Sequence, residues 1–159
     1  TRTISSAASD VYKRQTTHNV LSIGGNDLLG HLGFLKNNIE LTAIEILEQA
    51  VVLLAPIKNR YRAIVKNLSQ QNPNLLLCTV YEGNLVGDSF YSDVAFASKA
   101  MVSMFNDIVF NTASTFNVDV LELRNIFTSP EDYANPIEPS HLGGKKFSKE
   151  ILQWVNSGR

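Results

Sequence analysis

The sequence has few of the residues that build disulfide frameworks, metal clusters or membrane spans. Its 159 residues include one cysteine, Cys78, which excludes an internal disulfide and a cysteine-cluster metal site. The longest apolar run covers residues 50–55, far short of the roughly 20 residues that a transmembrane helix needs. The net charge is −1 and no basic stretch is present, so we expect neither nucleic acid nor a membrane span as a partner.

The common cofactor and nucleophile motifs are also missing. The sequence has no G-x-S-x-G elbow, no G-x-G-x-x-G fingerprint and no Walker loop. Its three histidines, His18, His31 and His141, lack the spacing of metal ligands. We therefore predict no metal and no cofactor.

The segments that are present alternate between strand and helix patterns. Apolar runs at 20–23, 75–81 and 118–123 predict buried strands, and Cys78 in the second run is expected to be a small core residue. A short helix or loop at 28–35 and helices at 40–69, 92–116 and 141–155 lie between and after the strands. This order predicts a single α/β domain with a parallel, helix-covered sheet.

The helix expected at 40–69 has two notable features. Ile44, Leu47, Val51 and Leu54 recur at helical spacing and predict an apolar stripe. Pro56 is expected to kink or divide the helix, because proline lacks the backbone N–H of a helical hydrogen bond.

Residues 1–15 differ from the rest of the chain. They are rich in serine and alanine and have no apolar periodicity. The tract also resembles a translated sequencing-adapter tail. We therefore expect 1–15 to be a non-native or disordered tail, and 16–159 to be the C-terminal portion of a single domain whose natural start lies upstream.

The first motif with chemical content follows the first predicted strand, Val20 to Ile23. Gly24 and Gly25 end the strand and turn the backbone, which places Asn26 at the strand's carboxyl end. This edge is where open α/β sheets bind ligands. Asn26 can donate its side-chain N–H to an oxyanion, and Asp27 can cap the following helix.

The tetrapeptide from Gly24 to Asp27 resembles the G-x-N-D block of the SGNH (GDSL-type) esterases and lipases. The resemblance implies a three-layer α/β/α sandwich with a flavodoxin-like parallel sheet that lacks its first strands. It also implies that Asn26 is an oxyanion-hole donor. The resemblance extends from Thr17 to the C-terminus, but only the family's third and fifth blocks are in place. The Gly-Asp-Ser nucleophile block and the block with an oxyanion-hole glycine have no counterpart in place.

A Gly-Asp-Ser triplet does occur, at Gly87-Asp88-Ser89. In the family this triplet precedes the G-x-N-D block and directly follows a strand, whereas here it comes later and has no apolar run immediately before it. We therefore interpret the triplet as turn chemistry and do not assign Ser89 as the nucleophile.

The second motif lies just before the last predicted helix, where the family has its D-x-x-H block. Two registers are possible. In one, Glu138 and His141 form the acid–base dyad. In the other, Asn135 stands at the acid position and Glu138 at the base position, which fits Pro139 and Gly143 better.

The chemistry of the base favours His141 slightly. A serine hydroxyl needs a base whose pKa lies near the working pH. The ordinary pKa of imidazole already lies there. A glutamate base would need its pKa raised by burial or by a like charge. We leave both registers open.

The resemblance implies a serine esterase or lipase that hydrolyses carboxylic esters by acyl transfer. The substrate would be a small ester, a lipid or an acetylated sugar. Because the nucleophile block is missing, we expect the chain as given to be inactive. The alternative is a non-catalytic SGNH-like binding or interaction domain. Neither a cytoplasmic nor a secreted location is favoured by the sequence.

Overall fold

Three short parallel strands form the sheet of the protein. The computed structural model describes residues 16–37, 40–86 and 88–157, so the prediction for 1–15 lies outside the described residues. The strands β1 (Asn19–Leu21), β2 (Leu75–Cys78) and β3 (Asp119–Leu121) lie in the order β1-β2-β3. Val20 pairs with Leu76, and Leu77 pairs with Val120. The three predicted strands and their parallel arrangement are confirmed, but only β2 is fully buried; β1 pairs with a strand on one side only among the described residues, and Val20 is 39% exposed.

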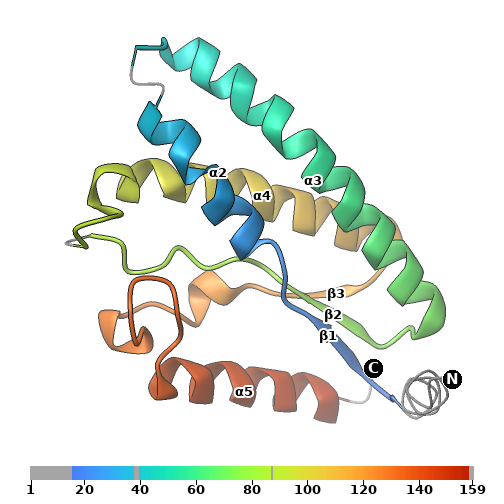
Figure 1. Ribbon diagram of the computed structural model, residues 1–159. Helices are drawn as coiled ribbons and strands as arrows, with labels where there is room; N and C mark the ends of the chain where they lie inside the picture. The colour runs from blue at the N-terminus through green and yellow to red at the C-terminus, as the bar shows by residue number, and fades with distance from the viewer. Residues whose placement is uncertain (1–15, 38–39, 87, 158–159) are drawn as a thin grey trace, which may run out of the picture.

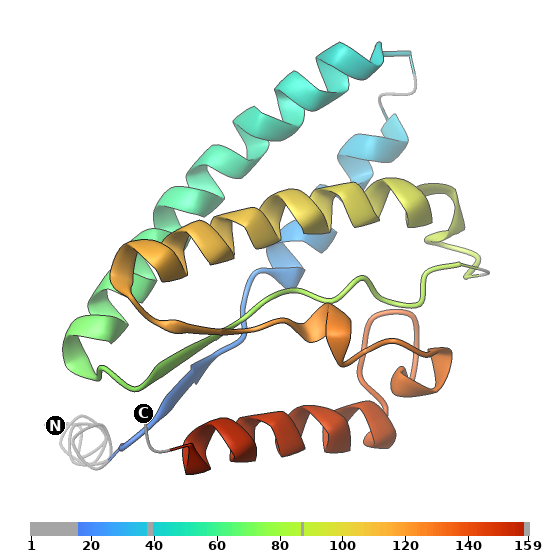
Figure 2. The same cartoon turned by 180° about the vertical axis from the view of Figure 1, so that it is seen from behind.

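Helices cover the two faces of this sheet. The helices α2 (Gly25–Asn37), α3 (Ala43–Gln71) and α4 (Ala95–Phe116) lie on one face, and α5 (His141–Asn156) lies on the other (Figure 1). The view from behind shows the same separation, with α5 alone below the strands (Figure 2). Short 3₁₀ turns at Ser92–Val94, Leu123–Asn125 and Pro130–Asp132 complete the elements. The arrangement confirms the predicted three-layer α/β/α sandwich.

The main core lies between the sheet and the helices α3 and α4. All four residues of β2 are buried, as expected for the central strand of a parallel sheet. Phe105 of α4 is fully buried and meets the ring of Tyr61 edge to face at a centroid distance of 5.6 Å. Cys78 is also fully buried and packs in a second cluster with Leu123 and Phe127, which confirms it as a core residue.

Helix α3 is continuous through Pro56, so the predicted division at this residue is wrong. Pro56 removes one helical hydrogen bond, but Leu54 and Ile57 on either side are buried and hold both halves of the helix against the core. The N-terminal end is fixed by a capping box in which Thr42 and Glu45 exchange side-chain and backbone hydrogen bonds.

The predicted apolar stripe of α3 is buried only in part. Leu54 is buried, but Ile44, Leu47 and Val51 are each at least 57% exposed. The reason is visible in Figure 1, where the first half of α3 extends away from the sheet. Periodicity therefore identified the helix correctly but not the extent of its contact with the core.

Candidate functional site

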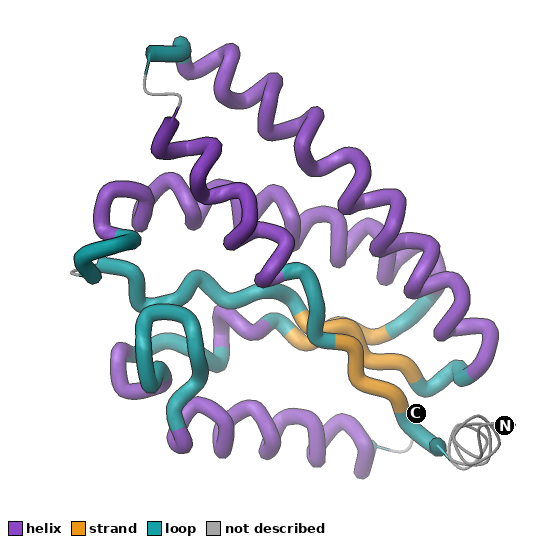
Figure 3. The backbone as a smooth tube through the Cα atoms, viewed as in Figure 1, coloured by secondary structure: helices purple, strands orange, loops and turns teal. Residues whose placement is uncertain are grey.

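The site lies on the side of the sheet where the strands end. The chain leaves all three strands in the same direction, and the segments that follow form a broad group of loops (Figure 3). A cleft of about 510 Å³ opens there. It is lined by the turn after β1, the start of α2, the segment after β2, one side of α4 and the loop before α5. This is the expected position for a ligand site in a parallel α/β sheet.

Gly24 forms the sharp turn between β1 and α2. Its φ of +109° is a conformation that residues with a side chain rarely adopt. A Cβ at Gly24 would lie 2.1 Å from Cζ of Phe105, so the backbone here passes directly against α4. Gly25 is the first residue of α2 and lines the cleft. The two glycines thus make the predicted turn and bring the helix start to the cleft.

Asn26 lies in the first turn of α2, is exposed and lines the cleft. The N-terminus of a helix has unpaired N–H groups and a partial positive charge, both of which stabilise an anion. An oxyanion near Asn26 would therefore have a side-chain amide and backbone donors within the same helical turn. The position suits the predicted oxyanion-hole role.

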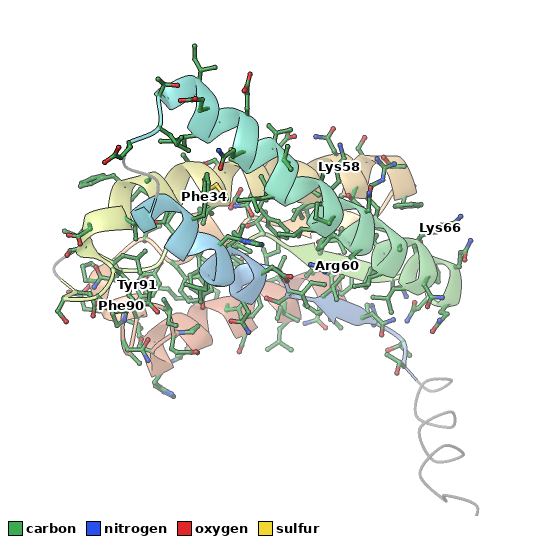
Figure 4. The ribbon with its side chains drawn as sticks, turned by 45° about the horizontal axis from the view of Figure 1, so that its top comes forward. Phe34, Lys58, Arg60, Lys66, Phe90 and Tyr91 are labelled. Carbon is green, nitrogen blue, oxygen red and sulfur yellow. The ribbon has the colours of Figure 1, made fainter. Side chains whose placement is uncertain are left out.

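Asp27 also lines the cleft, but it does not cap the helix as predicted. Helix α2 begins at Gly25, so Asp27 lies inside its first turn. Its carboxylate accepts a hydrogen bond at 3.1 Å from Arg60, which lies on α3 and is labelled in Figure 4. The prediction failed because the glycine pair was interpreted as part of the turn, whereas its second glycine is already helical.

The segment after β2 is held by a buried amide. Asn106 of α4 is 1% exposed, accepts the N–H of Val80 at 2.8 Å and donates to the carbonyl of Val80 at 2.8 Å. The Asn106 amide thus makes the two hydrogen bonds to the Val80 backbone that a neighbouring strand would otherwise make. It fixes the start of the segment that forms one wall of the cleft.

This wall is joined to the loop before α5. The hydroxyl of Tyr81 donates to the carbonyl of Ile137 at 2.8 Å, and the N–H of Asn84 donates to the carbonyl of Pro136 at 2.8 Å. Gly83, with a φ of +76°, allows close approach, because a Cβ there would lie 2.8 Å from the Pro136 oxygen. Burial raises the pKa of Tyr81, and the nearby charge of Glu138 raises it further.

The two registers of the second motif differ in where they place the base. Glu138 is exposed and lines the cleft together with Asn26. His141 is exposed, is the first residue of α5 and does not line the cleft. The oxygen Oδ1 of Asn135 accepts the N–H groups of Ile137 at 3.0 Å and Glu138 at 2.8 Å, which shapes the loop. The structure therefore brings Glu138, and not His141, to the cleft that contains Asn26.

An ion pair between the buried Asp132 and the partly exposed Lys146 supports this loop and was not anticipated from the sequence. Asp132 is 0% exposed and accepts the N–H groups of Thr128 and Ser129, and Lys146 of α5 lies 2.7 Å from its Oδ1. Burial alone would raise the pKa of Asp132, but the bonds from Lys146 and the two amides outweigh it and lower the pKa. The carbonyl of Asp132 accepts the N–H of Ser140 at 2.8 Å.

Ser140 is the N-cap of α5. Its Oγ accepts the N–H groups of Leu142 at 3.1 Å and Gly143 at 3.2 Å. A Cβ at Gly143 would lie 2.2 Å from the Asp132 oxygen, so the helix start packs directly on the chain around Asp132. Together, the cap and the ion pair connect α5 to the loop that carries Glu138.

Two serines that the sequence did not single out line the cleft. Ser98 donates its hydroxyl to the carbonyl of Ala95 at 2.8 Å, and Ser22 is exposed at the end of β1. Within the described residues, neither serine has a hydrogen bond to a histidine or a carboxylate. The hydroxyl of a nucleophilic serine needs such a base within hydrogen-bond reach.

Asp88 and Ser89 of the Gly-Asp-Ser triplet do not line the cleft. The carboxylate of Asp88 accepts the N–H groups of Phe90 at 2.8 Å and Tyr91 at 2.9 Å, which is the turn chemistry expected of this triplet. Ser89 is exposed, and Gly87 lies outside the described residues. Phe90 and Tyr91 lie at the end of the molecule where α4 begins (Figure 4).

Metal clusters and membrane spans are both absent from the described part of the chain. No group of three or more His, Cys, Asp or Glu residues there is arranged to hold a metal ion. None of the described helices is both long enough and apolar enough to cross a membrane.

Comparison with known proteins identifies the fold. No protein-family model matches the chain, and no curated protein sequence matches it. Among solved structures, LAE5, an alpha/beta hydrolase enzyme from the metagenome of Lake Arreo, Spain, is similar with a TM-score of 0.61 and 12% identity. The similarity covers 96% of this chain and 65% of LAE5.

The acetyl xylan esterase AlAXEase is similar with a TM-score of 0.57 and 19% identity. That similarity covers 93% of this chain and 71% of the esterase. The chain thus spans about two thirds of the length of each structure. At these identities the similarity establishes a shared α/β fold with two hydrolases.

Proposed function

We propose that this chain supplies the oxyanion-binding and base side of the active site of an SGNH-type serine esterase or lipase. The reaction would be hydrolysis of a carboxylic ester by acyl transfer. One observation carries the proposal: Asn26 and Glu138, from the two motifs that resemble the family, line the same cleft at the carboxyl ends of the strands. The shared fold with two hydrolases supports it.

In this scheme a serine oxygen attacks the carbonyl carbon of the ester, and the carbonyl electron pair moves onto its oxygen. Asn26 and the N–H groups at the start of α2 stabilise the resulting oxyanion. Glu138 accepts the proton of the serine and transfers it to the departing alcohol, and the ester bound in the cleft would supply the shielding from water that a glutamate base needs. Water then attacks the acyl-enzyme with the same base, which releases the acid and regenerates the serine. The serine itself would come from a Gly-Asp-Ser block that precedes the Asn26 motif; Ser89 is not assigned this role because it does not line the cleft.

A second candidate function is a non-catalytic domain that binds its ligand in the same cleft. The hydrogen bonds of Asn135 favour it, because its Oδ1 accepts two backbone N–H groups and, among the described residues, no histidine lines the cleft. Residues at the acid and base positions would then shape the loop without performing proton transfer. Both candidates use the same cleft, and they differ in whether an ester is cleaved.

Hydrolysis of p-nitrophenyl acetate distinguishes the two candidates. The chain would be extended at its N-terminus with a strand and a Gly-Asp-Ser block. The esterase proposal predicts turnover that falls by about 10²–10³-fold in kcat in Asn26→Ala, as for loss of one oxyanion donor. Asn84→Ala is the matched control, since its exposed side chain lies outside the cleft lining. Equal turnover in both variants would contradict the role of Asn26, and no turnover in a folded extended chain would favour the binding domain.

A further inference from the structure

Six residues of the cleft lining come from α2, α4 and the segment after β2 and are apolar except for one serine; we call this part of the lining the apolar lobe. Five of the six residues that define this lobe are at most 7% exposed. Its one hydroxyl, on Ser98, already donates to the carbonyl of Ala95 and therefore offers no free donor to a ligand. The lobe consists of Leu28, Leu29, Leu85, Ser98, Met101 and Val102.

The charged side chains that line the cleft are acidic. These residues are Asp27, Glu82 and Glu138, and no lysine, arginine or histidine of the described part of the chain lines the cleft. Arg60 pairs with Asp27 at 3.1 Å and Lys99 pairs with Glu82 at 2.7 Å, both from outside the lining. Glu138 has no ion pair within the described residues. A carboxylate on a ligand would therefore be repelled by the unpaired Glu138, whereas the start of α2 beside Asn26 favours only the local negative charge of an oxyanion.

We infer that the apolar lobe binds an uncharged, apolar group of several carbon atoms. An acyl or alkyl chain of an ester fits this chemistry, and a sugar does not, because its hydroxyls would lose water without finding partners in the lobe. Each buried CH₂ group contributes about 0.8 kcal/mol by leaving water, so chain length would be recognised. The link to an ester rests on the proposed function, whereas binding of the alkyl group does not.

The chain's two methionines give a direct probe of the lobe. Met101 lines it, whereas Met104, one turn further along α4, packs against the main core and does not line the cleft. The unmodified chain labelled with ¹³C at the methionine methyl groups would be titrated with 1-hexanol and, separately, with erythritol. We expect a saturable shift of the Met101 methyl with 1-hexanol, little change at Met104, and no shift with erythritol.

A pair of leucine variants provides the specificity control. Leu29→Glu places a carboxylate in the lobe and should weaken 1-hexanol binding by about tenfold or more, because the charge loses hydration there. Leu47→Glu makes the same change at a position on α3 that is 57% exposed, and should bind as the unmodified chain does. Retained secondary structure in both variants would be checked by circular dichroism.

Three results would overturn the inference: no saturable shift at Met101, equal shifts at both methionines, or a shift with erythritol. Titration of the unmodified chain decides this even if Leu29→Glu fails to fold. Failure of hexanol binding would overturn the inference about the apolar lobe but not the esterase proposal, because an esterase for acetyl or other short acyl groups needs no such lobe. Conversely, hexanol binding combined with no turnover in the extended chain would refute the esterase proposal and leave the apolar lobe intact.

Discussion

Replacing Gly24 by alanine tests the close contact that positions the start of α2. Two costs are expected. The φ of +109° is unfavourable for any residue with a Cβ, at about 1–3 kcal/mol. The new methyl group would also lie 2.1 Å from Cζ of the fully buried Phe105, and overpacking of this kind costs about 1–3 kcal/mol. We therefore expect Gly24→Ala to lower the free energy of unfolding by about 2–6 kcal/mol.

Urea unfolding followed by circular dichroism measures this loss of stability. A double-mutant cycle separates the cost of the backbone conformation from the cost of the contact with Phe105. Phe105→Leu removes the ring atoms that the new Cβ would meet. The double variant should therefore be about 1–3 kcal/mol more stable than the sum of the two single changes predicts, while the backbone cost remains.

Gly30→Ala is the control for the cycle. Gly30 lies inside α2, and a Cβ added there would have no atom within 4 Å, so the change should be neutral or stabilise by up to about 1 kcal/mol. A Gly24→Ala protein within about 0.5 kcal/mol of the unmodified chain would refute the contact. Strict additivity with Phe105→Leu would show that the ring does not resist the methyl group.

Three further predictions concern activity, association and pH. The chain as given should not hydrolyse p-nitrophenyl acetate above background, and a turnover that disappears in Ser22→Ala or Ser89→Ala would contradict this. The outer edge of β1 has no partner strand among the described residues, and Val20 is 39% exposed, so the chain should self-associate. Val20→Lys should shift the chain towards monomer in sedimentation velocity. A monomeric unmodified chain would argue against an exposed edge. Because the pKa of Asp132 is lowered on folding, its ion pair with Lys146 should stabilise the protein above about pH 4 and lose this effect as the pH falls further. Lys146→Met should therefore lower the free energy of unfolding by about 1–3 kcal/mol at pH 7 and by progressively less in acid. A loss of stability that does not depend on pH would contradict this assignment.

Much of the fold could be predicted because its strands are apolar runs bounded by turn residues. The segment Leu75–Cys78 is buried on both faces, and such strands lack polar alternation. The start of α2 could not be predicted in the same way, because Gly25 and Asn26 are residues that favour turns. Helix periodicity likewise does not reveal that the first half of α3 extends beyond the sheet.

The site could be predicted only in part. That the segments after parallel strands meet at one edge follows from topology, which is why Asn26 and Glu138 share a cleft. The choice between Glu138 and His141 depends on contacts distant in sequence, chiefly the bonds from Tyr81 and Asn84 to the loop. The ion pair between Asp132 and Lys146 was missed for a similar reason: no local pattern marks residues that are brought together by the packing of a loop on α5.

The most direct test of the central claim compares Glu138→Gln with His141→Ala in the extended, ester-hydrolysing chain. Glu138 lines the cleft and His141 does not, so kcat for p-nitrophenyl acetate should fall by about 10²–10⁴-fold in Glu138→Gln, the usual contribution of a general base. His141→Ala should retain nearly full activity, because its side chain lies outside the cleft lining. A large loss in His141→Ala with little change in Glu138→Gln would contradict the assignment of the base to Glu138.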